Sequence, residues 1–341
     1  MFSLITGANG FIGSHLTRFL INQGEKVRVL VRPKSNLRSL EGLPVEYAYA
    51  DLRDAHSLPA ALRNVQRVYH VAADYRLWAE NPEEIYESNV TGTRNLLAAA
   101  REAGNDRFIY TSSVGTLVPP HPRNLPDEDT HLRLQDMIGH YKRSKYLAEQ
   151  EALEAARKGQ PVVIVNPTTP VGPGDWKPTP TGRIILDFLN GHIPAYVDTG
   201  LNFVAVEDVA RGHSLAAERG QVGARYILGD RNLTLKQLLE ILSGLSGRPM
   251  PRLRLPHAVP YIASLADSLA ARLFRRAPRI PLEGVRMARH KMFVDCSMAK
   301  RELGFQPGPL EAALERAIHW YSENGYVKKP LRGRAAHECA A

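Results

Sequence analysis

Short apolar runs alternate with amphipathic helical patterns through the first half of the chain, and this alternation limits the fold more than any other feature. Each run is nearly continuous in apolar residues, as expected for a strand buried on both faces of a parallel sheet. The runs lie at 2–6, 26–31, 45–50, 67–73, 107–113 and 161–166. Helical patterns at 12–24 and 83–104 stand between them, and the first closes on Gly24. The alternation predicts a doubly wound α/β fold.

The pattern changes near residue 170, where Pro and Gly cluster at 170–182. A short strand near 203–210 and a strand–helix pair at 224–247 follow, which predicts a smaller, mixed α/β lobe at the C-terminal side. Open α/β folds bind ligands at the carboxyl edge of the sheet, so we expect this lobe to hold a substrate there. The predicted domains are a first domain at 1–169 with returns at 203–230, a mainly substrate-binding lobe at 170–327 and a flexible tail at 328–341.

Composition is ordinary for a globular protein. Of 341 residues, 44% are hydrophobic and 23% are charged, and no apolar run approaches the ~18 residues of a membrane span. Met1 leads directly into the first strand pattern, without a signal-peptide core. The two cysteines, Cys296 and Cys339, are far apart, and the histidines show no metal-ligand spacing. We therefore predict no disulfide framework, no metal site and a cytoplasmic protein.

The net charge of +9 is unevenly spread along the chain. Nine Lys or Arg and two acids lie between Arg252 and Lys291, which gives this segment a charge of +7. We interpret the segment as a solvated basic face or as a peripheral contact with an anionic surface, such as that of the inner membrane. No nucleic-acid motif accompanies it, so nucleic acid is not an expected partner.

Three glycines follow the first strand pattern and open the first helix. Gly7, Gly10 and Gly13 have the spacing G-x-x-G-x-x-G in the strand–turn–helix context that dinucleotide binding requires. Gly7 permits a sharp turn, Gly10 lets the backbone approach a pyrophosphate, and Gly13 allows close packing of helix and sheet. The helix N-terminus, with Phe11 and Ile12, offers free N–H groups to that anion. The segment predicts a dinucleotide-binding loop.

The end of the second strand favours one dinucleotide. An NAD-binding chain usually carries Asp or Glu there, to accept from the ribose 2′-hydroxyl. Val31 stands at that place, with Arg32, Lys34 and Ser35 following. A cationic group of this kind matches a 2′-phosphate in charge and shape. We predict NADP as the cofactor, with NAD as the alternative.

Two further strand ends would border the same cofactor. Asp51 and Leu52 follow the third strand pattern and are expected near the adenine. Ala72 and Ala73 follow the fourth strand pattern, and their small side chains leave room for the cofactor to pass.

A serine pair and a tyrosine–lysine pair complete the pattern. Ser112 and Ser113 end the fifth strand pattern, and Tyr141 and Lys145 project from one face of a helix at i,i+4 spacing. With the glycine loop, this combination resembles the extended short-chain dehydrogenase/reductase family over residues 2–325. The resemblance implies a Rossmann-type sheet, a small-molecule substrate and Ser-Tyr-Lys catalysis.

Hydride chemistry gives these residues their expected roles. A phenol has a pKa near ~10, and an adjacent ammonium lowers that pKa, so Tyr141 is the predicted general acid/base. Lys145 would tune Tyr141 and hold the nicotinamide ribose. Ser113 would hydrogen-bond the substrate oxygen, with Ser112 as its alternative and as a cofactor neighbour.

The resemblance also implies several supporting positions. Asn89 matches a residue that holds backbone near the site in this family. The segment after the sixth strand pattern matches backbone that faces the nicotinamide carboxamide, and its predicted contacts are Pro167, Thr168, Thr169 and Val171. Helices at 83–104 and 141–158 commonly form a homodimer in this family.

Within this family, some sequence signatures of the chain are typical of epimerases and others of reductases. Val114 and Gly115 replace the Asp-Glu pair of sugar dehydratases, and Leu201 replaces the diphosphate-binding Arg of nucleotide-sugar epimerases. Val31-Arg32 and the segment 111–116 match dihydroflavonol-reductase-like members, which are NADP-dependent carbonyl reductases. Longer stretches resemble the hopanoid-associated sugar epimerases, at 70–90, 137–149 and 165–202.

We therefore predict an NAD(P)-dependent oxidoreductase or epimerase that transfers hydride at a carbinol or carbonyl carbon. The resemblance implies a sugar-type or lipid-linked substrate in hopanoid metabolism. The first alternative is an NADPH-dependent carbonyl reductase. The second is a protein that senses NADP without turnover, which the joint presence of the Ser, Tyr and Lys disfavours.

Overall fold

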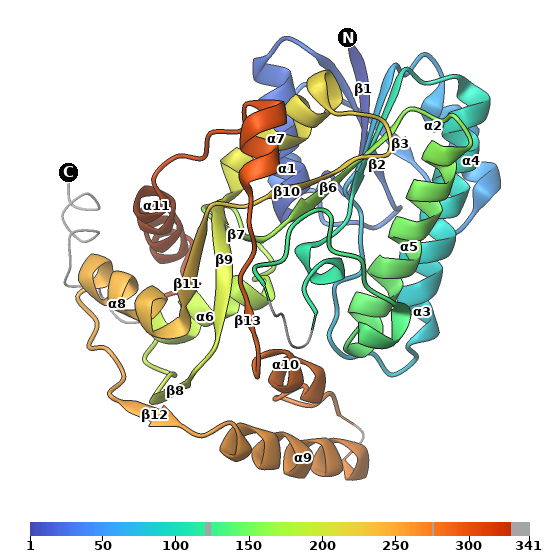
Figure 1. Ribbon diagram of the computed structural model, residues 1–341. Helices are drawn as coiled ribbons and strands as arrows, with labels where there is room; N and C mark the ends of the chain where they lie inside the picture. Colours follow the sequence, from blue (N-terminus) through green and yellow to red (C-terminus); the bar gives the residue numbers. More distant parts are fainter. Residues whose placement is uncertain (120–123, 275, 329–341) are drawn as a thin grey trace. The chain divides into compact units, whose positions relative to one another are not determined.

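The computed structural model describes residues 1–119, 124–274 and 276–328 (Figure 1). The chain divides into two compact units. The first consists of Met1–Thr168, Glu207–Leu228 and Asp295–Gln306, and the second of Thr169–Val206, Gly229–Val294 and the described part of Pro307–Ala341. Apart from Lys328, the tail predicted at 328–341 lies outside the described residues.

A parallel sheet of seven described strands forms the centre of the first unit, in the order β10-β6-β5-β4-β1-β2-β3. The strands are β1 Phe2–Thr6, β2 Lys26–Val31, β3 Val45–Tyr49, β4 Arg67–His70, β5 Arg107–Thr111, β6 Val162–Pro167 and β10 Arg225–Leu228. Every residue of β6 is buried, as a central strand covered on both faces requires. The predicted doubly wound fold is confirmed.

The strand order reverses between β1 and β4. On one side β1 pairs with β2 in the register Phe2↔Lys26, and on the other it pairs with β4 in the register Ser3↔Arg67. The loops that follow β1 and β4 therefore leave the same edge of the sheet in opposite directions. Such a switch point is where doubly wound sheets bind ligands.

Helices cover both faces of this sheet. They are α1 Phe11–Asn22, α2 Leu58–Leu62, α3 Glu83–Tyr86, α4 Gly92–Ala103, α5 Gly139–Arg157 and α7 Val206–Arg219. In Figure 1, α2, α4 and α5 lie along one side, and their buried side chains form one cluster with those of the strands. Leu96 and Ala148, on α4 and α5, meet Phe108 on β5 in that cluster. The packing fixes α5, which carries Tyr141 and Lys145, beside the carboxyl half of β5.

The helix predicted at 83–104 contains a π turn. A π-helical turn at Glu87–Thr91 separates α3 from α4. A π turn adds one residue to the helical path and rotates the side chains that follow it, and such turns are frequent at functional sites. The predicted helix is therefore present over residues 83–103, and the π turn, which the sequence did not predict, contains Asn89.

The second unit is a smaller, mixed α/β assembly. Its strands are β7 Thr169–Val171, β8 Ala195–Val197, β9 Gly200–Ala205, β11 Arg231–Thr234, β12 Leu253–Leu255 and β13 Lys291–Met292. Its helices are α6 Pro180–Leu189, α8 Leu235–Ser246, α9 Ala258–Leu273, α10 Leu282–Met287 and α11 Leu310–Glu323. Strand β9 pairs antiparallel with β11 and parallel with β7 and β13. The predicted mixed lobe is confirmed.

One boundary in the second half differs from the prediction. The run at 203–210 was expected to be a strand, but β9 ends at Ala205 and α7 begins at Val206. Glu207 and Asp208 occupy the first turn of α7, where the helix dipole favours negative charge. Among the described helices, none is both long and apolar enough to cross a lipid bilayer.

Candidate active site

The turn after β1 is built so that side chains are excluded. Gly7 has φ +68°, a left-handed conformation that favours glycine. A Cβ there would lie 2.6 Å from the backbone nitrogen of Ala72, the residue that begins the predicted passage after β4. The two loops of the switch point therefore touch backbone to backbone. Ala72 is held there by donating its N–H to Thr6 Oγ1 at 3.2 Å.

Close packing continues into α1. A Cβ on Gly13 would lie 2.1 Å from the carbonyl oxygen of Gly7, so α1 can approach β1 only with glycine at this position. Gly10 donates to that same oxygen at 2.9 Å and caps α1 without any side-chain hydrogen bond. The first N–H groups of the helix, including those of Phe11 and Ile12, have no partner one turn back. This is the arrangement that accepts a phosphate group.

Cationic side chains follow β2, as predicted. Arg32 is exposed, and the turn closes where Ser35 N donates to the Arg32 carbonyl at 3.1 Å. Lys34 takes φ +70° within this turn. The next residue, Asn36, accepts from Asn9 Nδ2 at 3.1 Å, which ties the turn to the glycine loop. The predicted cationic residues are thus tethered next to the loop that would bind the pyrophosphate.

Asp51, after β3, is already paired. The side chain of Arg53 donates three hydrogen bonds to its carboxylate, the shortest at 2.6 Å. The hydrogen bond from Arg53 lowers the pKa of Asp51, and Arg32 contributes a smaller electrostatic effect in the same direction. Leu52 packs against α4, because a Cβ on Gly92 would lie 2.9 Å from Leu52 Cβ. The single carboxylate of this strand end is therefore neutralised by Arg53.

Asn89 links the loop after β4 to α5. Its carboxamide oxygen accepts from Asp74 N at 2.7 Å, and its nitrogen donates to the Asp74 carbonyl at 2.9 Å. The same nitrogen also lies 2.9 Å from Ser144 Oγ, and Ser144 donates to the carbonyl of Tyr141 at 2.8 Å. Asn89 thus fixes the backbone beside Ala73 and the first turn of α5 together.

The predicted catalytic residues converge at the carboxyl end of β5. Ser113 and Tyr141 are half-buried, and the Ser113 hydroxyl is close enough to lower the pKa of the Tyr141 phenol. Lys145 is 2% exposed, and its Nζ donates to the Thr111 carbonyl at 2.7 Å. Its ammonium also lies 4.6 Å from the centre of the Tyr110 ring. The structure therefore brings the serine, tyrosine and lysine to one strand end.

Burial controls the protonation of this group. It raises the pKa of Tyr141 above its ordinary value, and the hydrogen bond with Ser113 offsets part of that rise. Burial also lowers the pKa of Lys145 to about 7, against a smaller opposing effect of Glu149. The spacing of Tyr141 and Lys145 in the sequence predicts instead that the lysine lowers the Tyr141 pKa. That expectation is wrong for the chain without cofactor, because desolvation is the largest effect on the Tyr141 pKa and Lys145 is not among the groups that lower it.

The two neighbouring serines have different partners. Ser112 donates a short hydrogen bond to the buried carboxylate of Glu149. Ser113 Oγ instead accepts from Gly115 N at 3.1 Å and influences the pKa of Tyr141. Ser112 is 5% exposed, so its hydroxyl is enclosed within the protein. This geometry favours Ser113, the residue preferred from the sequence, as the serine that faces a substrate.

Several residues at this strand end escape prediction from sequence. Glu149 accepts from Thr116 Oγ1 at 2.8 Å and from Asn166 Nδ2 at 2.9 Å, and it pairs with Arg225 at 3.5 Å. Burial also lowers the pKa of Lys142, the neighbour of Tyr141, to about 8. Charged residues in a polar helix usually face solvent, and the one available signal is that Glu149 stands i+4 from Lys145.

The histidines have mixed environments. His70 is buried and lies between Thr6 Oγ1, 2.7 Å from Nδ1, and Thr93 Oγ1, 2.9 Å from Nε2. Burial lowers its pKa to about 3, so the ring is neutral. It is a packing residue that contacts Thr6, which directly precedes the glycine loop. His121 lies outside the described residues.

Residues after β6 are divided between the units. Pro167 ends β6, and Thr168 donates its N–H to the Leu228 carbonyl at 3.1 Å within the first unit. Thr169 and Val171 belong to β7 of the second unit. Their contact with a cofactor stays a prediction.

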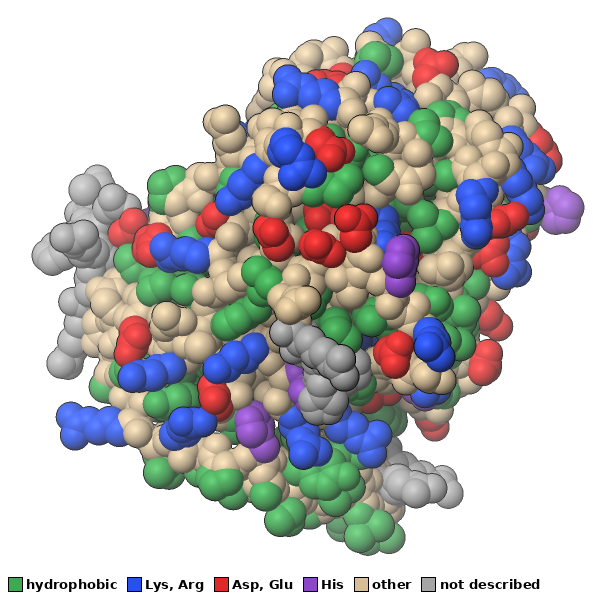
Figure 2. Space-filling view, viewed as in Figure 1, with side chains coloured by type: hydrophobic (Ala, Val, Ile, Leu, Met, Phe, Trp, Pro, Cys, Tyr) green, Lys and Arg blue, Asp and Glu red, His purple; other side chains and the backbone are tan. Residues whose placement is uncertain are grey.

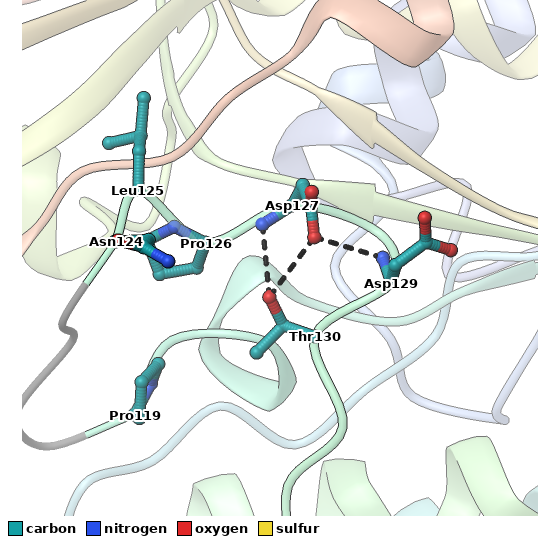
Figure 3. A pocket seen from close by; sticks show the side chains of 7 residues that line it. All are labelled: Pro119, Asn124, Leu125, Pro126, Asp127, Asp129 and Thr130. Atoms are coloured by element: carbon teal, nitrogen blue, oxygen red, sulfur yellow. Dashed lines mark hydrogen bonds between the residues drawn. The ribbon is translucent and has the colours of Figure 1, made fainter.

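A cavity of about 260 Å³ lies elsewhere in the first unit (Figure 3). Its lining residues are Pro119, Asn124, Leu125, Pro126, Asp127, Asp129 and Thr130. Figure 3 shows the Asp127 carboxylate turned toward Asp129 N, at 3.1 Å, and Thr130 Oγ1, at 3.2 Å. These bonds close a local turn. The cavity includes none of the predicted site residues, and we assign it no role in catalysis.

A doubly wound sheet with a side-chain-free glycine turn at its switch point defines a dinucleotide-binding Rossmann-type enzyme fold. The chain belongs to the NAD-dependent epimerase/dehydratase family, whose model matches residues 3–229. The resemblance stated from the sequence is therefore confirmed. The family is NAD(P)-dependent and comprises oxidoreductases and sugar epimerases.

Relatives match almost the whole chain. A protein of Synechocystis that carries the provisional name dihydroflavonol 4-reductase is 45% identical over 95% of both chains. Sterol demethylase protein B of Methylococcus capsulatus is 39% identical over 96% of this chain and 100% of its own. The crystal structure of gox2253 superimposes with a TM-score of 0.85 at 46% identity, over 96% of this chain and 99% of the other.

Proposed function

We propose that this protein is an NADP-dependent oxidoreductase that reduces a carbonyl carbon or oxidises the corresponding carbinol. Tyr141 is the general acid/base, Ser113 binds the substrate oxygen, and Lys145 positions the cofactor ribose. The observation that carries the proposal is that the Ser113 hydroxyl interacts with the Tyr141 phenol at the end of β5, where Lys145 is buried and donates to the Thr111 carbonyl. Two oxygen groups that can bind one substrate oxygen are therefore held together at the ligand-binding edge of the sheet.

The residues present fit a bound dinucleotide. The glycine turn leaves space that a Cβ at Gly7 or Gly13 would fill, and the uncapped start of α1 offers donors to a pyrophosphate. The nicotinamide ring supplies or accepts the hydride. Lys145 uses one of its three donors on Thr111, which leaves two for ribose hydroxyls.

The protonation of Tyr141 favours reduction at neutral pH. Since burial raises its pKa, the phenol carries its proton, and a protonated phenol can act as an acid. In reduction, the carbonyl oxygen accepts that proton as its carbon accepts hydride. Ser113 donates to the same oxygen while negative charge develops on it. In oxidation, the Tyr141 phenolate would take up the carbinol proton, and a positive charge close to the phenol would assist its deprotonation.

NADP is favoured over NAD by the charges around β2. Arg32 is exposed in a turn tied to the glycine loop, and the nearest strand-end carboxylate, Asp51, is paired with Arg53. A 2′-phosphate would therefore meet cations, whereas a free 2′-hydroxyl would lack the acidic acceptor that NAD enzymes usually provide.

For the substrate we propose a lipid-linked or polycyclic carbonyl compound of hopanoid metabolism. The name of the Methylococcus relative, which matches over its full length, supports a polycyclic terpenoid. In addition, Leu201 packs against the core of the second unit, so its position offers no cation to a nucleotide diphosphate. The name of the Synechocystis relative supports a reductase of the dihydroflavonol type as the nearest alternative.

Replacement of Tyr141 by Phe tests the proposal. We expect NADPH oxidation with a 3-keto polycyclic terpenoid as probe to fall about 10²–10⁴-fold, while NADPH affinity, measured by fluorescence, is retained. Tyr146→Phe is the matched control, because Tyr146 lies on α5 but donates to the Leu132 carbonyl at 3.1 Å. Turnover that survives Tyr141→Phe with cofactor bound would remove the catalytic assignment.

Epimerisation is the second candidate, and the family match supports it. An epimerase returns the hydride to the same carbon, so it consumes no net NADPH. Stoichiometric loss of NADPH with formation of an alcohol would establish the reductase. Interconversion of stereoisomers at constant NADPH would establish the epimerase.

A further inference from the structure

Exposed apolar side chains concentrate on one segment of the second unit. Of the sixteen large apolar residues that are exposed in the described chain, eight lie between Leu253 and Ile280. They are Leu253, Val259, Ile262, Leu265, Leu269, Leu273, Phe274 and Ile280. Scattered exposed apolar residues are normal on a protein surface, but a concentration of this kind marks an interaction site.

Helix α9 arranges most of these residues on one face. Ile262, Leu265, Leu269 and Leu273 follow each other at three- and four-residue spacing, so they form a single stripe along the helix. Ile262, Leu269 and Leu273 expose 65%, 71% and 77% of their surface. A helix of this length presents a stripe about 24 Å long.

The opposite face of α9 is already used. Ser264 is buried and donates to the carbonyl of Ile280 at 2.9 Å. Asp267 accepts from Ile280 N at 2.9 Å and pairs with Arg276 at 2.5 Å. These bonds fold the following segment back against α9 and fix which face of the helix is exposed. The apolar stripe is therefore on the face of α9 that these bonds leave uncovered.

Cations flank the stripe at both ends. Arg252 and Arg254 precede α9, and Arg279, Arg286 and Arg289 follow it, all of them exposed. In Figure 2, hydrophobic side chains gather at the lower margin, where Figure 1 shows α9, with Lys and Arg side chains beside them. Arg275 and the side chain of Arg272 lie outside the described part of the chain.

Nearby acids cancel only part of this charge. Asp267 is committed to Arg276, and Asp198 is shared by Arg254, at 2.9 Å, and Lys291, at 3.2 Å. The surface that a partner meets is therefore apolar along α9 and positive around it. We call this the α9 surface, defined by the apolar stripe of α9 and the basic residues at 252–254 and 276–291.

We propose that the α9 surface docks on an anionic lipid bilayer, with the stripe buried among acyl chains and the arginines at the headgroups. Interfacial helices use this combination of a large apolar face and nearby cations. A second copy of the chain fits less well, because a symmetric contact would bring two surfaces of the same charge together. Nucleic acid would leave the leucines uncovered. The proposal does not depend on the reaction that the first unit catalyses.

Vesicle co-sedimentation of the full chain tests the proposal. We expect binding to vesicles that contain phosphatidylglycerol and little binding to vesicles of phosphatidylcholine alone, with loss of binding as salt is raised. Arg286→Gln with Arg289→Gln should lower the partition coefficient about 30-fold, roughly fivefold for each charge. Leu269→Glu with Leu273→Glu should abolish binding, and both pairs are exposed, so folding should be retained.

Matched variants elsewhere serve as controls. Val222→Glu changes an exposed apolar residue of the first unit, and Arg63→Gln with Arg101→Gln removes two exposed charges there. These variants should bind vesicles as the native chain does. Binding that ignores phosphatidylglycerol, or that survives both α9 variants, overturns the proposal. The same holds if light scattering shows that the leucine variant only converts a dimer to monomers and the native chain does not bind vesicles.

Discussion

Arg32 is the single residue that we expect to decide between NADPH and NADH. Arg32→Ala should weaken NADPH binding about 10–100-fold, because charge-assisted hydrogen bonds to the 2′-phosphate are lost, and should leave NADH binding unchanged. Titration of cofactor fluorescence measures both affinities. Arg63→Ala, which removes an exposed arginine elsewhere in the first unit, is the control. Equal NADPH and NADH affinity in the native chain and in Arg32→Ala would contradict the assignment.

Glu149 is the residue whose replacement should cost most stability near the site. Its side chain is 1% exposed, one of its oxygens accepts from Ser112, Thr116 and Asn166, and the other lies 3.5 Å from Arg225. Glu149→Gln places an amide nitrogen among donors and leaves Arg225 without its anion.

We expect Glu149→Gln to lower the free energy of unfolding by about 2–4 kcal/mol in urea titrations. Glu151→Gln, two residues further along α5, should cost at most about 1 kcal/mol, because its pair with Arg94 is largely exposed. A similar loss in both variants would show that the buried network does not hold this strand end.

Among the structural elements, the junction of β1 and α1 depends on the absence of a side chain. Gly13→Ala would place a Cβ 2.1 Å from the backbone oxygen of Gly7, and backbone cannot yield as a flexible side chain can. We expect a loss of about 1–3 kcal/mol in the free energy of unfolding together with loss of NADPH binding.

The same substitution in α8 should act in the opposite direction. A Cβ on Gly244 meets nothing within 4 Å, and alanine favours the helix, so Gly244→Ala should raise the free energy of unfolding by about 0.5–1 kcal/mol. Denaturant titration compares the two variants directly. If Gly13→Ala binds NADPH as tightly as the native chain does, the glycine spacing is not required for cofactor recognition.

The elements differ in how far the sequence predicts them. Strands such as β6 are predictable because burial on both faces requires a continuous apolar run. The glycine loop is predictable because a side chain at its glycines would clash with neighbouring backbone. The π turn around Asn89 is not predictable, since its letters fit an ordinary helix. Glu149 is missed because burial of a helical carboxylate depends on partners from distant strands. Helix α9 is missed because an apolar stripe looks the same in sequence whether it faces a core or solvent.

For the whole molecule, two buried histidines should set the acid sensitivity of folding. Burial lowers the pKa of His70 to about 3 and of His213 to about 4. His213 Nδ1 lies 2.7 Å from the Val209 carbonyl, and its Nε2 lies 2.9 Å from Thr111 Oγ1, so both ring nitrogens are engaged in the neutral form. Both rings connect helices to the ends of the strands that carry the site.

The folded chain therefore binds fewer protons than the unfolded chain once the pH falls below the ordinary histidine pKa of ~6.5. The contribution of the two histidines to stability is complete above that pH and falls as the pH decreases, by about 1.4 kcal/mol per pH unit for each histidine. Glu128 acts in the opposite direction, because burial raises its pKa to about 7 and it takes up a proton in the folded state. The two histidines outweigh it below the ordinary histidine pKa.

Urea titrations between about pH 6 and 5 should show that the free energy of unfolding of the first unit falls as the pH decreases. His70→Gln should make the slope shallower by about one proton, even if the variant is less stable at every pH, because only the titrating group has been removed. His56→Gln, at an exposed histidine, should leave the slope unchanged. If His70→Gln keeps the native slope, protonation of the buried ring does not limit folding.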